Sequence, residues 1–152
     1  MEGTVRATLP LNYRGVTVEG LALRFEGGRV VEATARTGQQ TLQRLLDTDE
    51  GARRLGEVAL VPEGSAVSRL RTLFYHTLFD ENAACHLALG RAYPTTLEGG
   101  DGLDAESLRD RGANTSLEHV DFMIGSAALD VDGITAEGSA VPLLRGGRWA
   151  GA

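Results

Sequence analysis

Two residues in one predicted strand carry the sharpest chemical signal in the sequence. His119 and Asp121 are separated only by Val120. Because alternate side chains of a β-strand point to the same face, the imidazole and the carboxylate would lie side by side. Such a pair forms half of a site for a divalent metal ion. An exposed pair on the edge of a sheet would show the same pattern, so the motif alone leaves both interpretations open.

A second candidate ligand is His86, which lies in the predicted strand Cys85–Leu89. There it would share a face with Ala88 and Gly90, whose small side chains leave room for a metal ion or a substrate beside the ring. A core histidine bonded to a backbone carbonyl would fit the same pattern. Cys85 would face the opposite side, so we expect it to pack in the core rather than act as a nucleophile.

Two carboxylates and one tyrosine complete the set of candidates. Glu57 opens the otherwise apolar strand predicted at Glu57–Val61. Burying it unpaired would be costly, so burial would require a cation, whereas a position at the strand end would leave it in solvent. Glu81 lies in a polar cluster and also fits a solvated loop. Tyr93 could donate its hydroxyl to a developing oxyanion, or could simply line a pocket.

The elements that must position these residues are mostly short strands. Apolar, β-prone residues predict a strand at Val5–Leu11, and alternating polarity predicts another at Val16–Phe25. The turn Glu26–Arg29 leads into a return strand at Val30–Ala35. The later strands are predicted at Glu57–Val61, Cys85–Leu89, His119–Ile124, Val131–Thr135 and Val141–Leu144.

Few helices are expected. Thr37 could cap a helix over Gln39–Leu46 that presents leucines on one face, and shorter helices are predicted at Glu50–Leu55 and near Ala105–Arg111. Together these elements predict an α+β fold. We expect a single domain over residues 1–152, built on a twisted, mostly antiparallel β-sheet with a few short helices.

Composition narrows the classes of partner. With 152 residues, of which 42% are hydrophobic, the chain is long enough for one sizeable core. A net charge of −6 argues against nucleic acid as a partner, because phosphate binding needs clustered basic residues. The single cysteine, Cys85, suits a reducing compartment, and no segment approaches the ~18 apolar residues of a membrane span. We therefore expect a cytoplasmic protein with no membrane partner.

Several longer motifs, taken in order, resemble one family of enzymes. They match the C-terminal domain of the aminopeptidase T family, the thermophilic-type metallo-aminopeptidases, and the resemblance covers essentially the whole chain. The motifs are Gly56–Val61, Leu73–Ala83, Cys85–Gly90, His119–Gly125, Asp130–Ile134 and the final Trp149.

The resemblance implies an exopeptidase that removes N-terminal residues from peptides with a water activated by two metal ions. Zinc or cobalt would be the usual ions, with manganese or magnesium as other possibilities, and a homodimer would be the expected assembly. It gives Tyr93 a role as ligand or catalytic hydroxyl, makes Glu57 the expected bridging ligand, and allows Glu81 to act as general base. The implied metal ligands are Glu57, Glu81, His86, His119 and Asp121.

The sequence also departs from this family. Full-length members carry an additional N-terminal domain and a glutamate ligand upstream of the segment that begins here at Met1, and Glu2 lies too close to the next strand to replace that ligand. We therefore expect weak or no activity from this chain alone. A non-catalytic binding or dimerisation module that holds at most one metal ion stays open, as does a metal-free structural domain.

Overall fold

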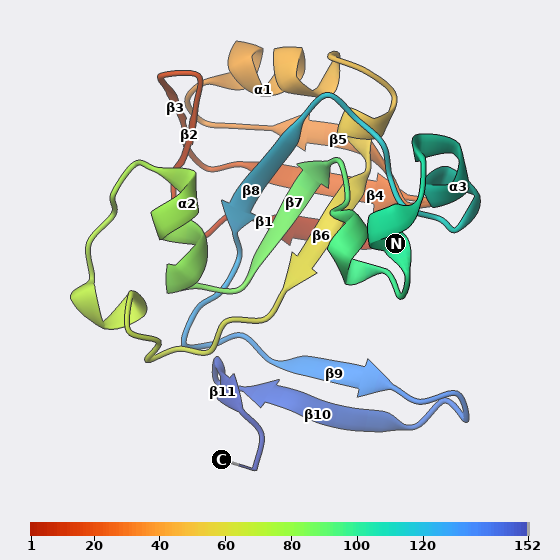
Figure 1. Ribbon diagram of the computed structural model, residues 1–152. Coiled ribbons are helices and arrows are strands. Elements are labelled where there is room, and N and C mark those ends of the chain that lie inside the picture. The colour runs from red at the N-terminus through yellow and green to blue at the C-terminus, as the bar shows by residue number, and fades with distance from the viewer. Residues whose placement is uncertain (152) are drawn as a thin grey trace.

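A computed structural model describes residues 1–151 (Figure 1). The predicted α+β class is confirmed, since short antiparallel strands dominate and the helices are few and short. In the described residues, the strands form several small sheets rather than one continuous sheet. The N-terminal sheet consists of β1 (Gly3–Arg6), β4 (Ala22–Glu26) and β5 (Arg29–Thr34), in that order. A separate hairpin pairs β2 (Leu11–Tyr13) with β3 (Val16–Val18).

A central antiparallel sheet in the order β6-β7-β8 carries the candidate ligands. Its strands are β6 (Leu55–Ala59), β7 (His86–Gly90) and β8 (His119–Met123). The helices are α1 (Gln39–Leu46), α2 (Thr77–Asp80) and α3 (Ala105–Asp110), supplemented by single 3₁₀ turns. No helix in residues 1–151 has the length and apolar character needed to cross a membrane.

The hydrophobic core lies between the N-terminal sheet and the central sheet, with α1 closing one side (Figure 1). The N-terminal sheet contributes Leu23 and Phe25, and α1 contributes the leucines that the sequence predicted for its buried face. The underside of the central sheet supplies Leu87, Leu89 and Phe122. Burying large side chains of this kind contributes roughly 1.5–3 kcal/mol each, so this packing fixes the sheet from below.

The other face of the central sheet carries the polar residues, because side chains alternate along each strand. The strand pairing places Glu57 opposite Ala88, and Ala88 opposite Asp121, in one row across the three strands. In the same way His86 lies opposite Met123, and Gly90 opposite His119. The predicted orientation of β7 is therefore found, with His86 on the polar face.

Glu57 reaches that face through a β-bulge. The pairing shifts between Leu55 and Glu57, so that Leu55 lies opposite the core residue Leu89 although Glu57 lies opposite Ala88. In a regular strand Leu55 and Glu57, which are two positions apart, would point to the same side of the sheet, whereas the bulge at Gly56 turns them to opposite sides. A Cβ atom at Gly56 would lie 2.3 Å from the carbonyl oxygen of Gly90, so only glycine fits this position.

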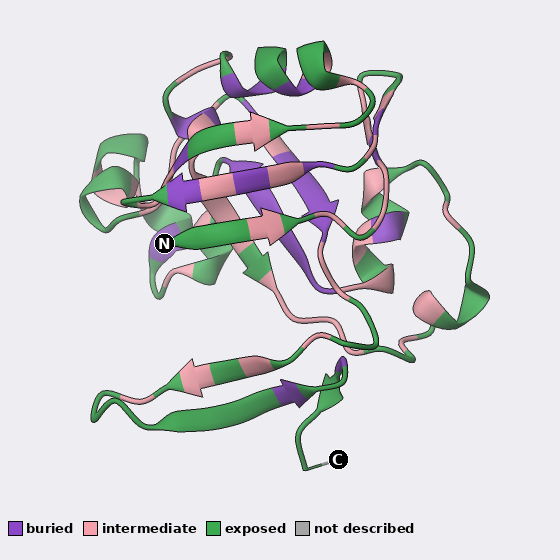
Figure 2. Ribbon diagram, turned by 180° about the vertical axis from the view of Figure 1, so that it is seen from behind, coloured by how far each residue is buried: buried purple, intermediate pink, exposed green. Residues whose placement is uncertain are grey.

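The C-terminal strands form an arm that projects from the rest of the molecule (Figure 1). The arm has the order β11-β10-β9 and contains β9 (Val131–Ile134), β10 (Ala140–Arg145) and β11 (Arg148–Trp149). Figure 2 shows it as mostly exposed. Its apolar Ile134, Val141 and Trp149 are 68%, 46% and 46% exposed, whereas Leu144 is fully buried.

Some boundaries predicted from sequence were wrong. The helix expected at Glu50–Leu55 is only a 3₁₀ turn at Gly51–Arg53, because Leu55 already belongs to β6. The strand predicted to end at Val61 ends two residues earlier, at Ala59. Thr37 does not cap α1, because it pairs with Glu19 across an isolated β-bridge. Gly38 takes the cap position instead, in the left-handed conformation.

We predict that Gly56→Ala destabilises the chain by about 1–3 kcal/mol, the usual cost of forcing extra atoms into a packed site. The added methyl group would meet two backbone carbonyls that cannot move without breaking the pairing of β6 and β7. Gly102→Ala is the matched control, because a Cβ atom there meets nothing within 4 Å and the backbone φ is negative. Urea denaturation of both variants gives the comparison, and equal midpoints would contradict the role assigned to the bulge.

Candidate metal centre

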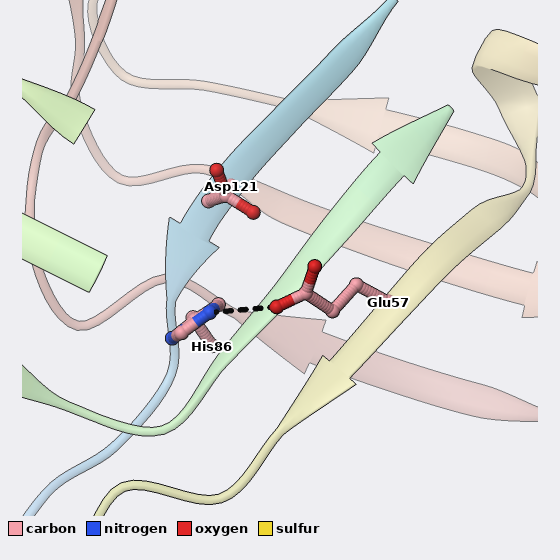
Figure 3. Close-up of side chains that lie close together, drawn as sticks. All are labelled: Glu57, His86 and Asp121. Atoms are coloured by element: carbon pink, nitrogen blue, oxygen red, sulfur yellow. Dashed lines mark hydrogen bonds and ion pairs between the residues drawn. The ribbon is translucent and has the colours of Figure 1, made fainter. Parts of the chain in front are cut away.

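Three candidate ligands meet on the polar face of the central sheet. Nitrogen and oxygen atoms of Glu57, His86 and Asp121 lie within 4.8 Å of one another. Figure 3 shows Glu57 extending from β6 over β7 towards His86, while Asp121 projects from β8. Ala88 separates the two carboxylates in the row, and its methyl group leaves the space between them free.

Both histidines of the site have their Nδ1 atoms occupied by backbone carbonyls. Nδ1 of His86 lies 3.1 Å from the carbonyl oxygen of Ala84, and Nδ1 of His119 lies 2.6 Å from that of Arg91. A carbonyl can only accept, so each Nδ1 must carry the proton and donate it. In the neutral ring, Nε2 of each histidine therefore presents a lone pair.

These lone pairs face carboxylate oxygens. Nε2 of His86 lies 3.1 Å from Oε1 of Glu57, and Nε2 of His119 lies 3.5 Å from Oε2 of Glu57 and 3.3 Å from Oδ1 of Asp121. The last contact lacks hydrogen-bond geometry, and Oδ1 of Asp121 is a buried oxygen without any hydrogen-bond partner in the described chain. A buried cluster of carboxylates and imidazoles requires positive charge. It is supplied either by protonation of the rings, which lets Nε2 of His86 donate to Glu57, or by a metal cation between the groups.

The donor set fits a divalent metal ion. Ligand atoms bound to zinc at about 2.0–2.2 Å in a tetrahedron lie roughly 3.3–3.6 Å apart, close to the spacings found here. Mixed imidazole and carboxylate donors are the set that zinc, cobalt and manganese accept. The two oxygens of Glu57 face different histidines, as a carboxylate bridging two ions would.

Burial raises the pKa of the Asp121 carboxyl, and the nearby charge of Glu57 adds to the shift while His119 and His86 oppose it. The pKa of Glu81 is also raised, first by burial and then by the charge of Asp121. Each shift reflects the cost of holding negative charge in this site. A bound cation would offset that cost.

A cleft of about 670 Å³ opens over this face of the sheet. The sequence-predicted residues that line it are Glu57, Glu81, Tyr93, His119 and Asp121. His86 does not line the cleft, but it contacts Glu57 at the cleft floor. The ring of Tyr93 lies against that of His119, with centroids 4.4 Å apart. The chain thus brings all the predicted site residues into one place, while their chemical roles stay predictions.

Two other residues with reactive side chains, His76 and Cys85, lie away from the candidate metal centre. His76 precedes α2, where its ring packs on Phe79 with centroids 5.2 Å apart. Cys85 is buried, and its thiol donates to the carbonyl of Val61 at 3.2 Å, as expected for a packing residue.

The sequence analysis missed one wall of the cleft. Asn12 and Tyr13, which lie between two predicted strands, line it from the β2–β3 hairpin, and Glu118 lines it beside His119. Glu118 is buried and accepts a hydrogen bond from Arg14 at 2.8 Å. Burial and the Glu118 carboxylate raise the pKa of Tyr13 to about 12. Only long-range packing brings this hairpin to the site, so no local pattern could have revealed it.

The similar proteins found by comparison of sequence and structure bear the names of aminopeptidases. Aminopeptidase 2 of Geobacillus stearothermophilus is 59% identical over 150 residues, which are 99% of this chain. Aminopeptidase T of Thermus aquaticus is 55% identical over 149 residues, or 98% of this chain. The solved structure of wild-type AmpT from Thermus thermophilus matches 97% of this chain with a TM-score of 0.88 at 54% identity.

The chain spans 36% of the length of each of these three relatives. Residues 1–149 match the family model described as thermophilic metalloprotease (M29), which confirms the resemblance drawn from the sequence motifs. The chain belongs to the thermophilic metalloprotease (M29) family.

Proposed function

We propose that this chain carries a metal-dependent aminopeptidase centre, which hydrolyses the N-terminal residue from peptides. One observation carries the proposal: Nε2 of two histidines, the carboxylate oxygens of the half-buried Glu57 and the buried carboxylate of Asp121 converge at the floor of a cleft. The aminopeptidases among its relatives support the same reaction class.

Two metal positions are consistent with the donors. His86 with Oε1 of Glu57 would hold one ion, and His119, Asp121 and Oε2 of Glu57 would hold the other, with zinc or cobalt preferred and manganese or magnesium as further candidates. When bound, such ions lower the pKa of a water molecule and polarise the scissile carbonyl. Glu81 could serve as a further metal ligand or as a general base.

We assign Glu81 the role of general base. Its pKa is raised, so its carboxylate is a better proton acceptor than an ordinary glutamate, and it lines the cleft close enough to Asp121 and Glu57 to feel their charges. It would accept a proton from the attacking water and pass it to the leaving amine.

We assign Tyr93 the role of an oxyanion donor. Its ring is held against His119, which directs the hydroxyl from the cleft wall, where it could donate a hydrogen bond to the oxygen of the tetrahedral intermediate.

The acidic lining would select a free amino terminus. With Glu57 and Asp121 holding the ions, Glu81 and Glu118 remain as the other acidic residues of the cleft lining, so a peptide ammonium group would be attracted while an acetylated end would not. This arrangement favours an exopeptidase.

A second candidate function is non-catalytic pairing between two copies of the chain. The exposed apolar side chains of the β9–β10–β11 arm favour it, since such surfaces commonly mark contacts between proteins. A homodimer formed through the arm is compatible with the metal centre.

We expect the zinc- or cobalt-loaded chain to release leucine from leucine p-nitroanilide slowly, in keeping with the weak activity expected from its sequence, and to leave the N-acetylated compound intact. Chelation should abolish the activity, and added metal should restore it. Release unaffected by chelator, or equal release from the acetylated compound, would contradict the proposal. No release at full metal loading would favour the pairing function, which analytical ultracentrifugation tests directly.

Asp121→Asn is expected to stabilise the metal-free chain by about 1–3 kcal/mol, the usual cost of a buried polar group without a partner. The raised pKa fixes the pH dependence. Between the unfolded and the raised folded pKa, the folded state binds more protons, so the stability of the wild-type chain falls as pH rises.

The increase in the free energy of unfolding caused by Asp121→Asn should therefore shrink towards pH 4 and be largest near pH 8. Zinc should raise the melting temperature of the wild type more than that of the variant, because the variant keeps only the position formed by His86 and Glu57. A variant that is less stable without metal at pH 8, or that gains as much from zinc, would remove Asp121 from the ligand set.

Glu81→Gln should lower kcat by about 10²–10⁴, the range for losing a general base, while metal content stays at the wild-type level. Glu98→Gln, which removes an exposed carboxylate outside the cleft, is the matched control. Steady-state kinetics with elemental analysis separates the two roles of Glu81. Loss of bound metal in Glu81→Gln would show that Glu81 is a ligand rather than a base.

A further inference from the structure

Arg91 is a charged residue of the cleft to which the mechanism above gives no function. Arg91 is the sole basic residue with a permanent charge among the described residues that line the cleft, and it stands among the carboxylates of Glu57, Glu81, Glu118 and Asp121. No carboxylate in residues 1–151 lies within ion-pair distance of its guanidinium. Arg14, at the same wall, differs because it is paired with Glu118 at 2.8 Å.

The backbone of Arg91 is fixed although its side chain is exposed. Its amide donates to the carbonyl of Glu118 at 2.7 Å, and its carbonyl accepts the Nδ1 proton of His119 at 2.6 Å. The guanidinium therefore extends from a rigid point that is directly connected to a candidate metal ligand.

The distance along β7 matches a short peptide. Ala88 lies level with Glu57 and Asp121, and Arg91 follows three positions later. At about 3.3 Å per residue for an extended chain, its Cα lies within roughly 10 Å of that of Ala88. An extended peptide spans about 3.3–3.6 Å per residue, so a tripeptide would reach from the metal centre to Arg91.

We propose that Arg91 is a specificity residue that binds the C-terminal carboxylate of short peptides whose amino terminus lies at the metal centre. The proposal rests on the function proposed above. The acidic floor attracts the ammonium end, and the single free guanidinium offers a planar fork that matches a carboxylate. The cleft is thus complementary to a zwitterion such as a di- or tripeptide, and longer or amidated peptides lose the second contact.

Calorimetry on the metal-free chain tests this binding without turnover. Leu-Gly-Gly and its C-terminal amide share the ammonium group and differ at the carboxylate. We expect the wild type to bind the free acid about tenfold more tightly, which is a typical effect of one charge-assisted contact. Arg91→Ala and Arg91→Gln should bind both peptides with the affinity that the wild type has for the amide.

Arg44→Ala is the control, because it removes the same charge from an exposed position on α1 that does not line the cleft. It should keep the preference for the free acid. A preference that survives in both Arg91 variants, or a wild type that shows no preference or binds neither peptide, would overturn the proposal. The zinc-loaded hydrolysis assay is independent, so its failure would reject the aminopeptidase function while the charge-dependent binding could still be read.

Discussion

The central constraint in this structure is the crowding of carboxylate oxygens and imidazole nitrogens on one face of a three-stranded sheet, which the surrounding packing must hold in place. Nε2 of His86, Nε2 of His119 and the carboxylate oxygens of Glu57 and Asp121 face one another at 3.1–3.5 Å, and one oxygen of Asp121 lacks any hydrogen-bond partner in the described chain. Such an arrangement persists without a cation only if its surroundings hold it. The apolar underside of the sheet, packed on the N-terminal sheet and α1, provides that support. The hydrophobic core therefore stabilises a site that is itself unfavourable.

The local sequence pattern predicted the site where the strands are regular. The period of two placed His86 beside Ala88 and His119 beside Asp121, and both expectations are found. The local pattern left the environment of Glu57 open between burial and solvent, because the bulge at Gly56 changes which face a side chain occupies, and alternation alone cannot show an inserted residue. It also missed Tyr13 and Glu118 as wall residues, since their proximity depends on tertiary packing between segments about a hundred residues apart. Fold class and ligand types could thus be read locally, but the shape of the cleft could not.

The family relationship and the geometry constrain each other. Identity of 50% or more over nearly the whole chain with several aminopeptidases makes the fold secure, and the TM-score of 0.88 to AmpT of Thermus thermophilus agrees. The geometry adds what identity does not state, namely that each oxygen of Glu57 faces a different histidine and that Arg91 is left without a partner in an acidic cleft. The chain covers 36–37% of the length of these relatives.

Both histidines take their orientation from the main chain, through the carbonyls of Ala84 and Arg91. In many metal sites a carboxylate side chain does this work and raises the basicity of the ligand with its negative charge. A backbone carbonyl is uncharged and does not titrate, and no point substitution removes it. Mutational drift around the site should therefore leave the tautomers intact, and the site's preference among metals should evolve through its carboxylates instead. Efforts to retune the metal would do best to alter those positions first.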